Sequence, residues 1–148
     1  MEFRVACVVE GHGDREAVPI LVSSDDCPAQ LGPQLLDRAA RVRSDVPLSV
    51  ILARREFEAW FLASAESLRG YKGLPPDLCP PADPEALQGA KEWLGDRMAE
   101  QKKYIETLDQ PGLARRFDLD LARRADSFDK CYREVVRLLR LLRSTVEL

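Results

Sequence analysis

Histidine and closely spaced cysteines are scarce in this sequence. It contains a single His, at position 12, and four Cys, at positions 7, 27, 79 and 131. No two cysteines form a Cys-x-x-Cys pair. Structural zinc sites and disulfide frameworks need clustered ligands or paired cysteines, so this spacing favours neither. We therefore expect reduced, mostly buried thiols.

Long apolar runs and an excess of positive charge are also missing. No stretch approaches the roughly 20 apolar residues that a membrane helix needs, and Glu2 and Arg4 interrupt the start in a way that is not typical of a signal peptide. We expect a cytoplasmic protein of bacterial type with no membrane contact. The net charge of -3 gives no global polybasic surface, so any nucleic-acid contact would need a local basic patch or a bound cation.

The composition fits one globular domain. With 148 residues and 45% hydrophobic content, the chain can build a single modest core. We expect a strand and helix core over residues 1–69, a Pro-rich loop over 70–84 and a helical part over 85–148. The last part is too short, and too dependent on the sheet, to form a second domain.

The most informative stretch is an apolar run that stops at a carboxylate. Residues 3–9 are rich in valine and are followed by Glu10-Gly-His-Gly-Asp14. Such a run predicts a buried parallel strand that delivers Glu10 to the carboxyl edge of a sheet, where open α/β folds bind their ligands. Gly11 and Gly13 would supply a tight turn with close approach to phosphate. The expected product is an acidic, concave corner.

A second strand of the same kind is expected over residues 48–53. It is followed by Arg54-Arg55-Glu56, so a second carboxylate lies at a strand end. If the two strands are parallel neighbours, Glu10 and Glu56 converge.

Periodicity and breakers predict the remaining elements. We expect a helix or turn over 14–22, a polar loop over 23–28, an amphipathic helix from Leu31 to Val42, a helix through 57–68, a helix from Asp83-Pro-Glu85 to Met98, a break at Asp109-Gln-Pro111, a small helix ending near Phe117 and a last helix from Asp126. Mixed strands and helices in this order predict an α/β fold.

Four blocks of sequence together resemble a known family. The pattern Glu10-Gly-x-x-Asp14 after a hydrophobic strand resembles the first motif of Toprim domains, found in topoisomerases, primases and OLD-type nucleases. The longer match resembles a bacterial Toprim-like family of unknown function that is often encoded beside SMC-like ATPases. The blocks are Val9-Glu-Gly-His-Gly-Asp14, Asp25-Asp-Cys-Pro-Ala-Gln-Leu-Gly-Pro33, Arg55-Glu-Phe-Glu-Ala-Trp-Phe-Leu62 and Ser127-Phe-Asp-Lys130.

This resemblance implies a Toprim-like, Rossmann-like three-layer fold with a small parallel sheet and a helical C-terminal half. It also implies a nuclease that cleaves phosphodiesters, working with an ATPase partner in defence or DNA maintenance. Carboxylates at strand ends suit Mg²⁺ or Mn²⁺, which prefer oxygen ligands. Glu10 is then the metal ligand or general base, and Lys130 matches the late basic position that would stabilise phosphoryl charge. The further candidate ligands are Asp14, Asp25, Asp26, Glu56 and Glu58.

The sequence departs from the family in its first third. A central segment is missing near residues 21–24, and Val22 and Ser24 stand where the family pattern would place an Asp-x-Asp pair. The chain could be a naturally short relative, a shortened chain or one half of a sheet completed in a homodimer. Two further functions stay open: a catalytically degenerate binding or regulatory subunit, and a small-molecule phosphohydrolase that uses the same acids.

Several of these residues also have ordinary structural interpretations. Asp14 fits a plain helix cap, and Asp25-Asp26 fits an acidic turn. Glu56 and Glu58 lie two residues apart, so on a helix at most one would point into the site. The arginines of the last helix could track phosphates, but their acidic neighbours favour a solvated face.

Overall fold

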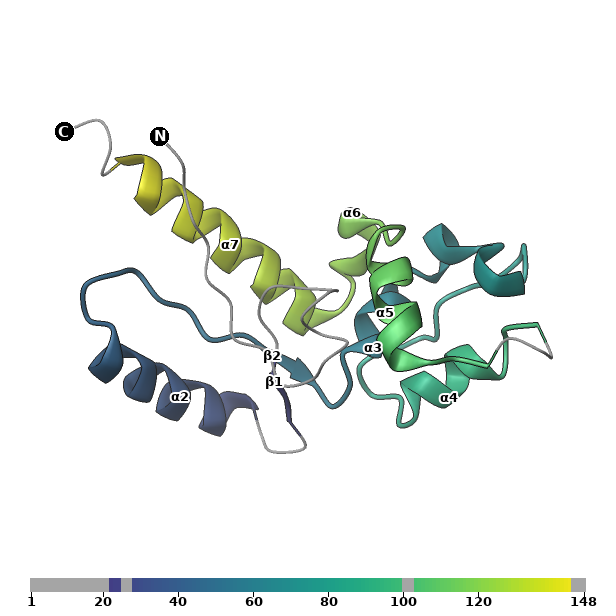
Figure 1. The fold of residues 1–148 in the computed structure, drawn as a ribbon, viewed down its shortest axis with the longest axis horizontal. Coiled ribbons are helices and arrows are strands. Elements are labelled where there is room, and N and C mark those ends of the chain that lie inside the picture. The colour runs from purple at the N-terminus through teal and green to yellow at the C-terminus, as the bar shows by residue number, and fades with distance from the viewer. Residues whose placement is uncertain (1–21, 25–27, 100–102, 145–148) are drawn as a thin grey trace.

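The computed structural model describes residues 22–24, 28–99 and 103–144, and Figure 1 shows their arrangement. Over these residues the fold is mixed but mainly helical, with a small parallel sheet. The predicted strand over 3–9, the predicted Glu10 corner and Asp25-Asp26 lie outside the described residues.

The sheet is a β-α-β unit. Strand β1, Val22–Ser24, pairs in parallel with strand β2, Leu52–Arg54, so that Val22 aligns with Leu52 and Ser24 with Arg54. Parallel strands need a crossover connection, which here contains helix α2, Pro28–Val42. Helix α2 lies on one side of the strand pair and helix α7, Asp126–Ser144, on the other (Figure 1).

Strand β1 corrects the prediction for this region. The sequence predicted a helix or turn up to residue 22 and a polar loop over 23–28, but Val22–Ser24 form a strand. A segment with two serines has weak intrinsic strand preference. Its strand conformation comes from pairing with β2, about thirty residues away, which no local pattern encodes.

Strand β2 is shorter than predicted and begins later. Residues before it bond to α7 instead of to a strand: the Ser49 hydroxyl donates to Glu134 at 2.8 Å, and Arg137 donates to the Leu48 carbonyl at 3.2 Å. Of the predicted strand over 48–53, only Leu52 and Ala53 therefore belong to the observed strand, which runs over Leu52–Arg54.

The core is built around helix α3, Glu58–Ala63, all of whose residues are buried. Two short 3₁₀ helices follow, η1 at Ala65–Leu68 and η2 at Tyr71–Gly73. Helices α4 (Ala90–Gly95), α5 (Glu106–Ala114) and α6 (Leu119–Ala122) pack around α3. Edge-to-face ring contacts connect the aromatic side chains at its centre, which are Phe57, Trp60, Phe61, Phe117 and Phe128.

Two helix boundaries differ from the prediction. Asp83 does cap, accepting from the Glu85 and Ala86 amides, but it closes only a turn, and α4 starts at Ala90 after Gly89 in a left-handed conformation. Asp109-Gln-Pro111 was expected to break the chain, yet it lies buried inside α5. Tertiary bonds override the local signal there, because Asp109 accepts from the Tyr71 hydroxyl at 3.1 Å and pairs with Lys72 at 2.7 Å.

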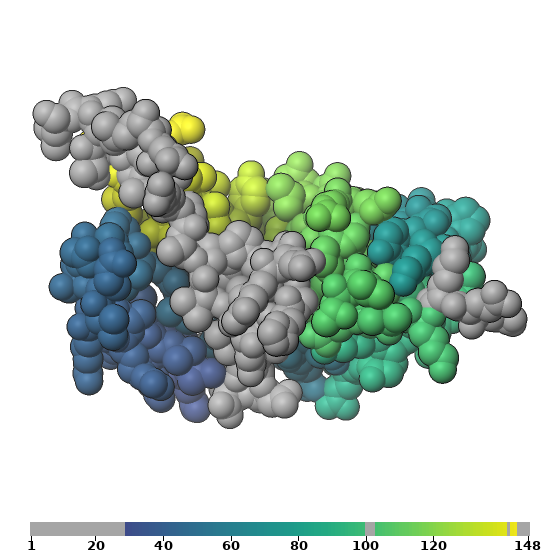
Figure 2. All heavy atoms as spheres, viewed as in Figure 1, coloured from purple at the N-terminus to yellow at the C-terminus, as the bar shows by residue number. Residues whose placement is uncertain are grey.

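The apolar face of helix α7 is only partly buried by the rest of the described chain. On α7, Phe128 and Cys131 are buried, whereas Val135 and Leu139 further along the same stripe are exposed. Helix α2 and the helical cluster containing α4 lie at opposite ends of the molecule (Figure 2).

Among the described residues, no helix combines the length and apolarity that crossing a membrane requires.

The ring cluster around α3 gives a stability prediction. We expect Phe61→Ala to lower the free energy of unfolding by about 3–5 kcal/mol, because it removes a fully buried ring between two others. The matched control is Leu108→Ala on α5, where the side chain is 65% exposed and the loss should stay within about 0.5 kcal/mol. Urea unfolding followed by tryptophan fluorescence measures both, and equal losses would contradict the assignment of α3 as the core.

Candidate functional site

The carboxyl ends of β1 and β2 meet at one edge of the sheet. The pairing of Ser24 with Arg54 aligns the two strand ends. On β2 this edge carries two exposed arginines, Arg54 and Arg55, and no ion pair to another described residue involves either guanidinium. The described part of the expected acidic edge is therefore basic.

The backbone at this edge is strained. The Glu56 amide donates to the Arg54 carbonyl at 3.0 Å, which closes a γ-turn around Arg55, and Arg55 has a φ of 66°. An L-residue other than glycine adopts this region at a cost of roughly 1–2 kcal/mol. The turn persists because both flanks are fixed: Ala53 and Phe57 are buried in the core.

The Glu56 carboxylate points to helix α4. Its Oε1 accepts from the amides of Gly89 at 2.9 Å and Ala90 at 3.2 Å, and its Oε2 accepts from the Lys91 amide at 3.2 Å. These are amides at the start of α4 that have no partner within the helix. Glu56 thus caps α4 from outside and ties it to the end of β2.

Glu58 lies in the core, with only 1% of its surface exposed. Its Oε1 accepts from the Tyr104 hydroxyl at 2.5 Å and from Gln110 Nε2 at 2.8 Å. Burial raises the pKa of the Glu58 carboxyl, and the two hydrogen bonds and the nearby Lys91 ammonium only partly oppose that rise. The group connects α3 to α5 and to the segment before α5.

Lys130 is exposed on α7. The helix runs antiparallel to β2: Ser127, near its start, accepts a hydrogen bond from Trp60, and Glu134, one turn after Lys130, contacts Ser49. The start of α7 accordingly lies near the arrowhead of β2 (Figure 1). Lys130 is placed between these two contacts, on the side of the sheet that α7 covers.

The described residues do not form a metal site. Among residues 22–24, 28–99 and 103–144, no group of three or more His, Cys, Asp or Glu side chains is placed to hold a metal ion. Glu56 and Glu58 do not converge, since one caps α4 and the other is enclosed with Tyr104 and Gln110. The other predicted ligands and phosphate-binding residues, Glu10, Gly11, Gly13, Asp14, Asp25 and Asp26, lie outside the described part of the chain.

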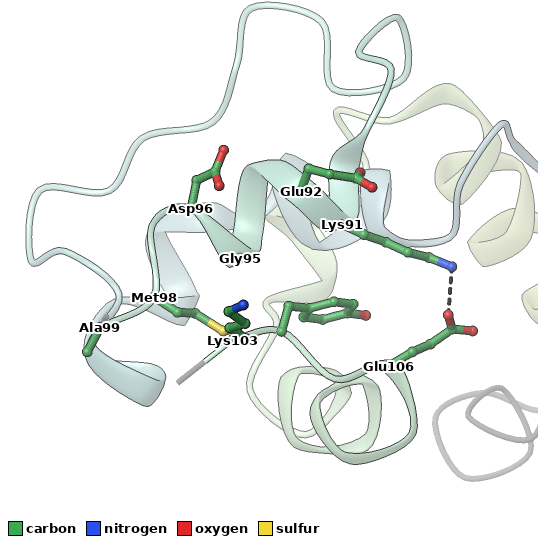
Figure 3. Close-up of a pocket in the computed structure, with 9 residues that line it drawn as sticks. Lys91, Glu92, Gly95, Asp96, Met98, Ala99, Lys103 and Glu106 are labelled. Atoms are coloured by element: carbon green, nitrogen blue, oxygen red, sulfur yellow. Dashed lines mark hydrogen bonds and ion pairs between the residues drawn. The ribbon is translucent and has the colours of Figure 1, made fainter. Parts of the chain in front are cut away.

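A separate cavity of about 600 Å³ opens between α4 and the segment before α5. Lys91 and Glu106 form an ion pair of 2.7 Å at one wall (Figure 3), and Tyr104 also lines the cavity. Burial lowers the pKa of Lys91, but the carboxylates of Glu106, Glu58 and Glu56 outweigh it and leave this pKa above its usual value. The cavity contains none of the residues that the sequence singled out.

Three polar residues in these contacts were not predicted. Tyr104 and Gln110 enclose Glu58, and the buried Glu85 accepts from the amide and the hydroxyl of Ser127 at the start of α7. Glu85 had only the local signal of a helix start. Their partners lie tens of residues away in the sequence, so no motif spacing could have identified them.

Comparison with known proteins does not assign a family. No protein-family model, curated protein or solved structure matches this chain.

The raised pKa of Glu58 predicts how stability depends on pH. A raised pKa means that the folded state favours the protonated acid, so its stabilising contribution is complete below the ordinary pKa of 4.5 and is lost as pH rises through the folded-state pKa. We expect Glu58→Gln, which stays neutral, to gain stability relative to wild type as pH rises from about 4.5 towards 7. Urea unfolding across this range measures the difference, and parallel profiles would contradict it.

The Glu56 cap predicts a separate loss. Glu56→Ala leaves three amides of α4 without this acceptor, and we expect the free energy of unfolding to fall by about 1–2 kcal/mol. Glu92→Ala is the control, because Glu92 is an exposed carboxylate on the same helix whose removal should cost within about 0.5 kcal/mol. Equal effects of the two substitutions on the urea midpoint would contradict the capping role.

Proposed function

We propose that this chain is a Toprim-like domain that cleaves phosphodiesters with Mg²⁺ or Mn²⁺ at the carboxyl edge of the β1–β2 pair. The substrate class is nucleic acid. The ATPase partner and the setting in defence or DNA maintenance are proposed on the family resemblance alone.

The observation that carries the proposal is the parallel register of the two strands. Ser24 pairs with Arg54, and Asp25 and Asp26 follow Ser24 directly in the sequence. Open α/β folds bind their ligands where strand ends meet in this way. In the sequence, two predicted acidic residues thus follow one strand of this pair, and Arg54 and Arg55 stand at the end of the other.

The proposed ligands are the predicted acids that lie outside the described residues. They are Glu10, Asp14, Asp25 and Asp26, since Glu56 and Glu58 already accept hydrogen bonds from protein groups. A bound Mg²⁺ in such a place supplies an activated water and stabilises the leaving oxygen. Lys130, which is exposed beside the sheet, is proposed to neutralise charge on the phosphoryl group.

One observation favours a second function. Both described carboxylates that were candidate ligands take part in holding helices together, and Val22 and Ser24 stand where the family pattern has acids. A chain with these features could keep the fold and lose catalysis. The second candidate is thus a catalytically degenerate binding or regulatory subunit.

Metal binding separates the two candidates. We would titrate Mg²⁺ and Mn²⁺ calorimetrically into wild type and Glu10→Ala at matched ionic strength, and assay cleavage of single-stranded and duplex DNA with the same proteins. The nuclease proposal expects saturable binding and cleavage in wild type, both lost in Glu10→Ala because a ligand is removed.

Asp77→Ala, which removes an exposed loop carboxylate, is the control and should behave as wild type. Saturable binding without cleavage of any DNA would favour the degenerate subunit. Neither binding nor cleavage in wild type would overturn the proposed metal-dependent activity of this chain.

A further inference from the structure

We infer that the γ-turn at Arg54 and Arg55 is a binding site for phosphate groups of a nucleic-acid backbone. The inference rests on the proposed function in one respect, the class of ligand, and it names residues that the resemblance leaves without a role. It requires no metal and no catalysis, so it can be tested separately.

Strain at this turn is the first observation. Glycine is the usual residue where φ is positive, yet Arg55 occupies the position with a φ of 66°. The Glu56 cap on α4 and the buried Phe57 hold the turn from one side, and the buried Ala53 holds it from the other. Residues kept in sparsely populated backbone regions by their surroundings concentrate at functional sites.

Charge is the second observation. Arg54 and Arg55 begin from Cα atoms about 3.8 Å apart, and both are exposed with no carboxylate partner among the described residues. Four other exposed arginines have carboxylate partners: Arg123 and Arg133 pair with Asp129, Arg124 pairs with Glu66 and Arg137 pairs with Glu134. The turn therefore presents two adjacent guanidinium groups without a carboxylate partner among the described residues, on a protein whose net charge is -3.

The chemistry of arginine indicates the ligand. A guanidinium is planar and presents paired donors that match two oxygens of one phosphate. Two such groups on consecutive residues can contact one phosphate or two neighbouring phosphates of a flexible strand. The turn lies at the carboxyl end of β2, which is the edge of the sheet where the proposed function expects catalysis.

The test measures binding without catalysis. Fluorescence anisotropy of a labelled short single-stranded oligodeoxynucleotide is followed in EDTA, over a series of salt concentrations, with wild type, Arg55→Gln, Arg54→Gln and Arg55→Gly. Each Gln variant removes one guanidinium, and we expect affinity to fall about tenfold, as for a lost hydrogen bond to a charged group. The slope of log affinity against log salt should decrease by about 0.7 for each lost phosphate contact.

Arg55→Gly separates binding from folding. Glycine accepts the positive φ without strain, so we expect the Tm to stay within about 4 °C of wild type while affinity falls as much as in Arg55→Gln. Arg115→Gln, which removes an exposed arginine at the end of α5, is the charge-matched control and should bind as wild type.

Each outcome decides the inference. Loss of affinity in the Arg54 and Arg55 variants but not in Arg115→Gln supports it, even if wild type cleaves no DNA and the proposed nuclease activity fails. Affinity of Arg55→Gln and Arg54→Gln within twofold of wild type overturns it, even if wild type cleaves DNA. An equal loss in Arg115→Gln also overturns it, because only net charge would then matter.

Discussion

The fold depends on buried and half-buried carboxylates that accept hydrogen bonds from other parts of the chain. Glu58, inside the core helix α3, is enclosed by Tyr104 and Gln110, and Glu56 and Glu85 accept from amides at the starts of α4 and α7. A buried carboxylate without partners is costly, so each of these acids restricts where its partner segment can lie. Three elements far apart in the sequence are thereby oriented around one buried helix.

The same contacts position the edge of the sheet. The turn at Arg55 is followed at once by the Glu56 cap and by the buried ring of Phe57, so its strained backbone cannot relax without disturbing the core. Helix α7 is attached to the segment before β2 through Glu134 and to α3 through Ser127. The exposed arginines are thus carried by a rigid support, which is the usual arrangement for a binding site.

A good part of this architecture could be predicted from the sequence. The amphipathic patterns of α2 and α7 and the apolar, β-branched run before Arg54 gave elements of the right type in nearly the right places, because these patterns report which face of an element is buried. The predictions failed where a distant partner decided the outcome. Val22–Ser24 became a strand through β2, and α5 runs through Pro111 because Asp109 is held by Tyr71 and Lys72.

The candidate site divides in the same way. The sequence by itself determined which chemistry is available, since it places carboxylates and arginines directly after β-branched runs, and residue types do not depend on the fold. Only the tertiary structure decided how those groups are used: Glu56 and Glu58 became internal hydrogen-bond acceptors, while Arg54 and Arg55 stayed exposed at a strained turn. The physical reason is that a side chain's role is set by its partners in space and by its access to water, and neither is contained in the spacing of residues along the chain.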